Sequence, residues 1–105
     1  MWPTASTPAL LYFEEEEAIA IETAAEADLR PLPVRRHRFP DGELRLQLPT
    51  DLPARVVVWR GLQQPNEKLV ELLLLARTAH ELGALQLTLV APYLAYMRQD
   101  MAFNP

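Results

Sequence analysis

The sequence predicts an α/β fold in which a largely parallel sheet is flanked by helices and carries a β-hairpin. Short apolar runs of strand length alternate along the chain with helical patterns, and this order is typical of βαβ sheets. Turn residues at positions 40–42, Pro-Asp-Gly, separate two further strand patterns and add the hairpin. With 105 residues, 50% of them hydrophobic, the chain is expected to form one domain over residues 1–105.

The first strand is predicted at residues 9–13, where the run ALLYF is apolar throughout. A helix should follow it, because the acids Glu14–Glu17 would lie in the first turn, near the positive end of the helix dipole. This helix is expected to end near Asp28, since Pro31 disfavours helical geometry in the residue before it.

The hairpin is predicted from strands at residues 32–38 and 44–48, and leucine occupies every second position of the latter. The arginine-rich stretch Arg30–Arg38 could form a phosphate or nucleic-acid patch. Alternation along a strand places those side chains on two faces, however, and a net charge of −4 argues against a polyanion partner. A solvated strand beside an acidic helix is therefore the preferred interpretation.

The second half of the chain predicts a βαβ unit, with strands at residues 55–60 and 86–91 around a helix at 67–82. Both strands are apolar runs of the kind buried on both faces of a sheet. Asn66 should cap the start of the helix and Gly83 should end it. One helix face carries a set of apolar residues expected to be buried, namely Leu69, Leu72, Leu73, Ala76 and Ala79.

Composition excludes several classes of function. The absence of Cys excludes disulfides and thiolate metal sites, and three Gly are too few for a glycine-rich phosphate loop. No apolar run is long enough to span a membrane, and the start lacks a basic signal-peptide region, so a cytoplasmic protein is expected. His37 and His80 lack partners for a metal site, and Glu14–Glu17 is better explained as a charged helix start than as a cation site.

Two loops remain as candidate ligand sites. Phe39 could stack on a planar base, while the acids at positions 41 and 43 could accept hydrogen bonds from an exocyclic amine. The second loop, residues 93–100, follows the last predicted strand and ends in Arg-Gln-Asp, a set suited to a phosphate chain. Ligands bind at the carboxyl ends of parallel strands in open α/β sheets.

Three motifs occur in order: FPDGE at residues 39–43, NEKLVELL at 66–73 and PYLAYMRQD at 92–100. Together they resemble the amino-terminal domain of ribose-phosphate pyrophosphokinases, and the likeness extends from Leu10 to the end of the chain. The resemblance implies a phosphoribosyltransferase-type three-layer fold, and an enzyme that transfers diphosphate from ATP to ribose 5-phosphate for nucleotide biosynthesis. The ATP-binding residues that it implies are Phe39, Asp41, Gly42, Glu43, Arg98, Gln99 and Asp100.

The resemblance also implies what the chain lacks. The metal-binding His, the catalytic Lys loop and the ribose 5-phosphate loop of the family follow the segment that these 105 residues match. The chain is therefore expected to contain no catalytic residue and no metal ligand, to lack a second domain and to be inactive alone. Magnesium would enter as MgATP, and a homodimer or higher homo-oligomer is expected.

Two departures from the family pattern support an alternative. Glu14–Glu17 stands where the family has small residues and Gly, and Met101-Ala102-Phe103 follows the Arg-Gln-Asp motif in place of basic residues. The alternative is a non-catalytic paralogue that serves in assembly or regulation.

Overall fold

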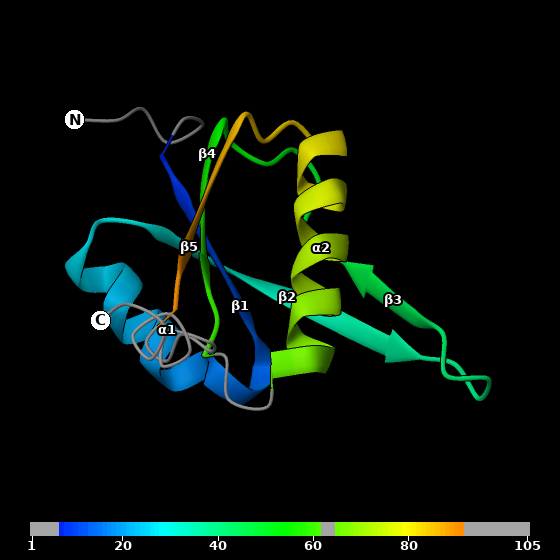
Figure 1. Ribbon diagram of the computed structural model, residues 1–105. Coiled ribbons are helices and arrows are strands. Elements are labelled where there is room, and N and C mark those ends of the chain that lie inside the picture. Colours follow the sequence, from blue (N-terminus) through cyan, green and yellow to red (C-terminus); the bar gives the residue numbers. More distant parts are fainter. Residues whose placement is uncertain (1–6, 62–64, 92–105) are drawn as a thin grey trace, which may run out of the picture.

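The structure is a computed structural model that describes residues 7–61 and 65–91. Five strands form one sheet in the order β3-β2-β1-β4-β5, and all neighbours are parallel except the antiparallel pair β2–β3 (Figure 1). This mixed, mostly parallel sheet confirms the predicted α/β class. In chain order the elements are β1 Ala9–Phe13, η2 Glu14–Glu16, α1 Glu17–Glu26, β2 Arg30–Arg38, β3 Leu44–Gln47, β4 Arg55–Trp59, α2 Pro65–Glu81 and β5 Gln86–Val90.

Helices α1 and α2 cover opposite faces of the sheet, and the central strand β1 contributes side chains to both faces. Leu11 and Phe13 belong to the larger hydrophobic cluster, which Leu75 of α2 completes. Leu10 and Tyr12 belong to the smaller cluster, with alanines of α1. Because successive strand residues point to opposite faces, the all-apolar run at positions 9–13 is buried along its whole length. The result is a three-layer arrangement.

Strands β2 and β3 form the predicted hairpin, which extends beyond the sheet as a two-stranded ribbon (Figure 1). In this ribbon Arg36 pairs with Leu46 and His37 pairs with Arg45. Leu46 packs against the core cluster and Leu48 is part of it, so the predicted leucine face is confirmed.

Helix α2 differs from the prediction at its start and in its buried face. It begins at Pro65, which places Asn66 inside the helix instead of at its cap. Gly83 ends it as predicted, with a φ of +114° that favours glycine. The buried residues are Glu71, Leu75 and Ala79, whereas the side of the predicted face that carries Leu73 is exposed. Leu72 packs against the same core cluster, so Leu72 and Ala79 of the predicted face are confirmed, whereas Leu69 and Leu73 are exposed.

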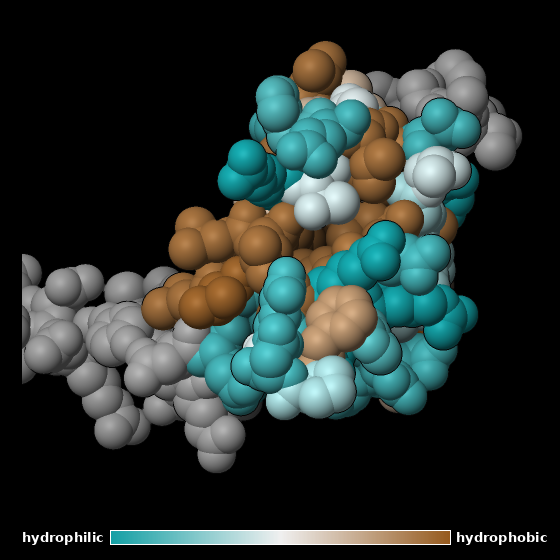
Figure 2. Space-filling view, turned by 90° about the vertical axis from the view of Figure 1, so that its right-hand side faces the viewer, coloured by the Kyte–Doolittle hydropathy of each residue, from teal (hydrophilic) through white to brown (hydrophobic). Residues whose placement is uncertain are grey.

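The exposure of strand β5 contradicts the prediction that this strand is buried on both faces of the sheet. The strand forms at the predicted position, but every one of its residues is exposed because it lies at the sheet edge. Leu87 and Leu89 are 39% and 43% exposed, although each pairs in register with a buried valine of β4. Figure 2, which looks onto the α2 side of the molecule, shows hydrophobic surface bordered by hydrophilic side chains. No helix among the described residues is long and apolar enough to cross a membrane.

Candidate nucleotide-binding edge of the sheet

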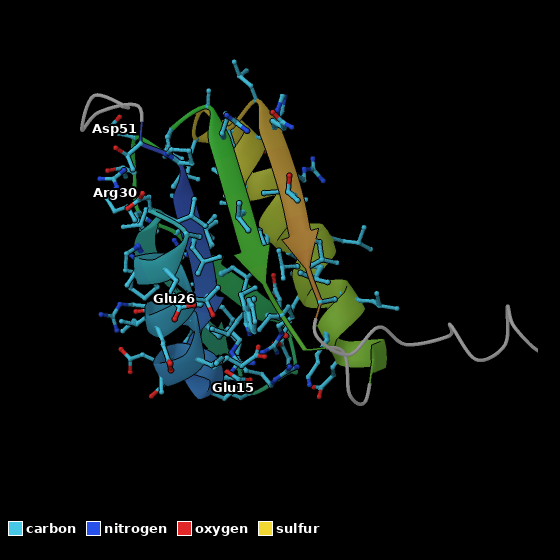
Figure 3. The ribbon with its side chains drawn as sticks, turned by 90° about the vertical axis from the view of Figure 1, so that its left-hand side faces the viewer. Glu15, Glu26, Arg30 and Asp51 are labelled. Atoms are coloured by element: carbon cyan, nitrogen blue, oxygen red, sulfur yellow. The ribbon has the colours of Figure 1, made fainter. Side chains whose placement is uncertain are left out.

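Charged side chains gather where the parallel strands end. Glu15 and Glu16 lie in the 3-10 turn that follows β1, and Arg60 directly follows β4. Figure 3 places Glu15 at the end of the sheet toward which the β4 and β5 arrows point, whereas Arg30 and Asp51 lie toward the other end. This is the edge at which open α/β sheets bind their ligands.

Arg60 is the centre of this charged group and is only 1% exposed. Its Nη1 lies 3.1 Å from carboxylate oxygens of both Glu15 and Glu16, and its Nη2 donates a hydrogen bond to Glu71 Oε1. The backbone N–H of Gly61 donates to the other oxygen of Glu16 at 2.9 Å. A buried cation is stable only when it is paired in this way.

Glu71 connects this group to the hairpin. It is 3% exposed on the inner row of α2, and its Oε2 accepts a hydrogen bond of 2.7 Å from Arg36 of β2. Arg36 also donates to Glu15 at 2.6 Å. The guanidinium carbons of Arg60 and Arg36 lie 4.2 Å and 5.3 Å from the centre of the Phe13 ring, within the range of cation–π attraction.

The ion pairs favour the charged forms of Arg60 and Glu15. Burial by itself would lower the pKa of Arg60, but the carboxylates of Glu71, Glu16 and Glu15 outweigh it and raise that pKa. Burial by itself would raise the pKa of Glu15; a backbone hydrogen bond and the guanidiniums of Arg60 and Arg36 reverse the effect and hold it below its usual value. The turn after β1 is thus fixed by ion pairs, which the sequence interpretation of Glu14–Glu17 as a charged helix start did not include.

Sequence reasoning missed Arg60 and Glu71. A signal for Glu71 was present, because it lies four residues before Leu75 and eight before Ala79, on the same helical row. A carboxylate on a buried row requires a cation opposite it. Arg60 follows an apolar strand directly, so its position at the carboxyl edge was predictable, but its burial was not.

The hairpin tip holds the first predicted ligand loop in a defined geometry. The Phe39 N–H donates to the Glu43 carbonyl at 2.8 Å, and the Gly42 N–H donates to the Phe39 carbonyl at 2.9 Å. The Glu43 N–H donates to Asp41 Oδ1 at 2.9 Å, and Arg38 donates to the Gly42 carbonyl at 3.2 Å. Gly42 has a φ of +92°, a conformation that favours glycine.

The tip residues are exposed and border an open surface depression of about 620 Å³. Phe39, which is 36% exposed, and the side chains of Asp41 and Glu43 are among its lining residues. The His37 ring lies edge-on to Phe39, with 4.4 Å between the ring centres. An aromatic ring and two carboxylates are therefore accessible together at this tip.

The second predicted ligand loop cannot be placed, because Arg98, Gln99 and Asp100 lie outside the described residues. His37 and His80 are both exposed. Within residues 7–61 and 65–91, no group of three or more His, Asp or Glu side chains could hold a metal ion.

The arginines of β2 are divided between two faces, as alternation predicts. Arg36 and Arg38 point toward α2, where they pair with Glu71 and Glu67. Arg35 lines a cavity on the α1 side together with Tyr12. A single basic patch along Arg30–Arg38 is therefore absent from the described surface, and the acids that neutralise half of it come from α2 and the 3-10 turn.

The chain is thus a three-layer α/β protein with an exposed hairpin loop and a charged carboxyl edge, the edge at which open α/β sheets bind ligands. Over residues 9–105 the chain matches the family model described as the N-terminal domain of ribose phosphate pyrophosphokinase. The chain therefore belongs to the ribose-phosphate pyrophosphokinase family, as its motifs predicted.

Curated relatives support this assignment. The chain is 40% identical over 83 residues to a ribose-phosphate pyrophosphokinase of Methanopyrus kandleri, covering 78% of the chain and 28% of the relative. It is 43% identical over 68 residues to that of Saccharolobus solfataricus, covering 63% and 23%. It is 31% identical over 96 residues to that of Halobacterium salinarum, covering 91% and 34%. The chain thus spans about a quarter to a third of the length of these relatives.

Proposed function

We propose that the chain is the ATP-contacting, amino-terminal part of a cytoplasmic ribose-phosphate pyrophosphokinase. The whole enzyme would transfer a diphosphoryl group from ATP to ribose 5-phosphate, giving phosphoribosyl pyrophosphate for nucleotide biosynthesis. Membership of the family supports the enzyme class. The accessible hairpin tip supports a nucleotide role for this part of it.

The single observation that carries the proposal is the pre-formed loop at residues 39–43. Its backbone hydrogen bonds and the capping contact of Asp41 fix the loop, while its side chains stay exposed beside the 620 Å³ depression. Phe39 offers a face for stacking on adenine, and the Asp41 and Glu43 carboxylates can accept hydrogen bonds from the exocyclic amine. A loop already held in its binding conformation loses less entropy when the ligand binds.

Arg98, Gln99 and Asp100 are proposed to contact the phosphates of ATP, and Gly42 to permit the turn that presents the adenine contacts. The described residues offer no magnesium site of their own, so in this proposal the ion arrives bound to the ATP phosphates as MgATP. The ion would neutralise phosphate charge during transfer. Ribose 5-phosphate would bind to parts of the family's sequence outside these 105 residues.

The apolar surface of α2 and β5 supports self-association. Leu69, Val70 and Leu73 of α2 are 38%, 53% and 73% exposed, and the neighbouring edge strand β5 is exposed along its length. An exposed apolar edge strand is a template for pairing with another chain. We propose that a second copy pairs with β5 across a two-fold axis, because closed symmetric dimers bury the same patch on both subunits.

ATP binding tests the nucleotide proposal. The chain should bind ATP saturably in a calorimetric or NMR titration, and Phe39→Ala should weaken binding by about tenfold through loss of stacking. Glu81→Gln, an exposed change on the distant end of α2, should leave the affinity unchanged. Equal affinity of wild type and Phe39→Ala would contradict the proposal for the hairpin.

Activity and assembly need separate measurements. Incubated with ATP, magnesium and ribose 5-phosphate, the 105-residue chain should form no phosphoribosyl pyrophosphate, because catalysis of phosphoryl transfer needs positioned cations around the transferred group. Turnover above the blank would overturn the expected inactivity.

Sedimentation tests the proposed dimer. The chain should sediment as a dimer, and Leu89→Lys should dissociate it into monomers. A monomer at every concentration would overturn the β5 pairing.

The non-catalytic alternative rests on the fixed acidic turn, where Glu16 accepts hydrogen bonds from both Arg60 and the Gly61 N–H. A carboxylate that already occupies these donors leaves them unavailable to a ligand phosphate. A chain that dimerises but binds no ATP would favour this alternative, in which the domain serves in assembly or regulation.

A further inference from the structure

The Arg38 guanidinium bridges the loop at the hairpin tip and helix α2. Its Nη1 donates a hydrogen bond to the Gly42 carbonyl at 3.2 Å, and its Nη2 donates to Glu67 Oε1 at 3.0 Å. Arg38 is the last residue of β2, and Glu67 lies in the first turn of α2. One planar, forked side chain therefore joins the backbone of the loop to a helix that packs against the sheet.

The other hydrogen bonds of the loop are internal to it. Among the described residues they join Phe39 to Glu43, Gly42 to Phe39 and Glu43 to Asp41. The loop lies at the end of a two-stranded ribbon that extends beyond the sheet (Figure 1), and an isolated two-stranded hairpin is only marginally stable in water. The guanidinium of Arg38 thus supplies the hydrogen bond that ties this loop to the helical layer.

Two contacts hold the same peptide unit of the loop. The peptide that follows Gly42 presents its carbonyl to Arg38, at 3.2 Å, and its N–H to Asp41 Oδ1, at 2.9 Å. Gly42 has a φ of +92°, and a glycine backbone is free to rotate because no side chain restricts it. The contact of Arg38 therefore fixes the peptide that in turn orients the Asp41 carboxylate.

The spacing of helix and strand matches along this contact. Glu67 and Glu71 are one helical turn apart, a rise of about 6 Å, and their partners Arg38 and Arg36 are two strand residues apart, about 6.6 Å. The two pairs differ in burial, because the side chains of Arg38 and Glu67 are 49% and 79% exposed whereas Glu71 is buried. The outer pair therefore contributes little to stability, and its distinguishing feature is its contact with the loop.

We propose that Arg38 is a positioning residue for nucleotide binding. Through Gly42 it holds residues 39–43 in the conformation that presents Phe39 and the two carboxylates, and Glu67 holds Arg38. The inference rests on the proposed ATP role of the hairpin tip. Arg38 does not border the depression at the tip, so it acts through the loop backbone and not by contact with the ligand. A loop that is fixed before binding loses less conformational entropy when the ligand binds.

Charge attraction and positioning predict opposite effects at Glu67. ATP is an anion, so removal of a nearby negative charge would strengthen its binding if attraction alone decided the affinity. If the position of the loop decides the affinity, removal of the carboxylate that holds Arg38 weakens binding. Glu67→Gln, which keeps the size of the side chain, therefore separates the two explanations.

The test is a calorimetric or NMR titration of the chain with ATP at constant ionic strength. Arg38→Gln should weaken ATP binding about fivefold and Glu67→Gln about twofold, because each loosens the loop before the ligand binds. The matched controls are Arg77→Gln and Glu81→Gln, the two members of another exposed pair on α2, and both should bind like wild type. Equal or tighter binding by Glu67→Gln, or the same loss in Arg77→Gln as in Arg38→Gln, would overturn the proposal.

A measurement without ligand separates this inference from the proposed function. Hydrogen exchange of the Glu43 N–H should be faster in Arg38→Gln than in wild type and unchanged in Arg77→Gln, while the amides of β1 stay protected in all three and verify folding. Unchanged exchange at Glu43 in a chain that binds ATP would overturn the positioning role alone. Faster exchange in a chain whose wild type binds no ATP would overturn the proposed function of the hairpin, and the nucleotide role of Arg38 with it.

Discussion

The two faces of the β2–β3 ribbon contain similar residues in opposite situations. Toward α2, Arg36 and Arg38 are each paired with acids from the helix, and Arg36 also joins the buried group around Arg60. Toward α1, Arg35 and Arg45 line a cavity and have no ion pair with any described carboxylate. Position on the strand, and not residue type, therefore decides whether an arginine of the ribbon pairs with a described carboxylate.

The difference follows from which helix covers each face. Helix α2 presents Glu67 and Glu71 one turn apart, and these carboxylates meet Arg38 and Arg36. Helix α1 packs its alanines against β1, and Arg35 and Arg45 on its side of the ribbon form no ion pair with a described carboxylate. The ion pairs on the α2 face fix the ribbon against the helix. The loop at its tip and the face toward α1 are therefore held in position as well.

The largest expected effect is at Glu71. Glu71→Gln should destabilise the chain by about 3 kcal/mol at neutral pH, because it removes the buried negative charge that pairs with Arg60 and Arg36 and replaces one acceptor oxygen by an NH2 donor that faces a guanidinium. The matched control is Glu67→Gln, one turn earlier on α2, whose pair with Arg38 is exposed and should contribute less than about 1 kcal/mol. Urea unfolding measures both, and equal losses would contradict the contrast between buried and exposed pairs.

An intermediate effect is expected from neighbouring arginines. Arg36→Gln should cost about 1 to 2 kcal/mol, since two charged hydrogen bonds are lost at a half-buried site. Arg35→Gln should be neutral, or should stabilise by a few tenths of a kcal/mol because it relieves repulsion across the ribbon. Thermal unfolding of the two variants compares the faces directly. A larger loss from Arg35→Gln would reverse the assignment of the two faces.

The smallest effect is a pH dependence at Glu15. Its lowered pKa means that the native state favours the carboxylate, so its stabilisation is complete above the ordinary value of 4.5 and is lost as the pH falls through the native pKa. The stability difference between wild type and Glu15→Gln should therefore be constant near neutral pH and disappear in acid. Urea unfolding at several pH values measures it; a difference that grows toward low pH would exclude this role.

Much of the fold was predictable because it depends on local patterns. The apolar run at residues 9–13, the leucine alternation in β3 and the Gly83 terminator each specify an element from nearest-neighbour sterics and burial. The exposure of β5 was not predictable, since an apolar run does not show which strand lies at the sheet edge. The start of α2 was misplaced because Asn66 fits a cap as well as a first turn.

The candidate site also has one part that could be predicted from the sequence and one part that could not. The loop at residues 39–43 is a local motif, so its turn chemistry and exposed Phe39 could be expected from the sequence. The meeting of Glu15, Glu71 and Arg60 joins residues up to 56 positions apart, and no local pattern encodes it. The sheet order brings the ends of β1 and β4 together and sets α2 against them.

By itself, the sequence determined the α/β class, the hairpin with its exposed loop and the family, because these depend on short-range periodicity and contiguous motifs. The tertiary structure alone decided which charges are buried and paired, which arginines form no ion pair among the described residues and which apolar residues of the described surface are exposed. The physical reason is that burial and electrostatic pairing are properties of segments packed together in space, and a side chain acquires its environment only when distant elements meet around it.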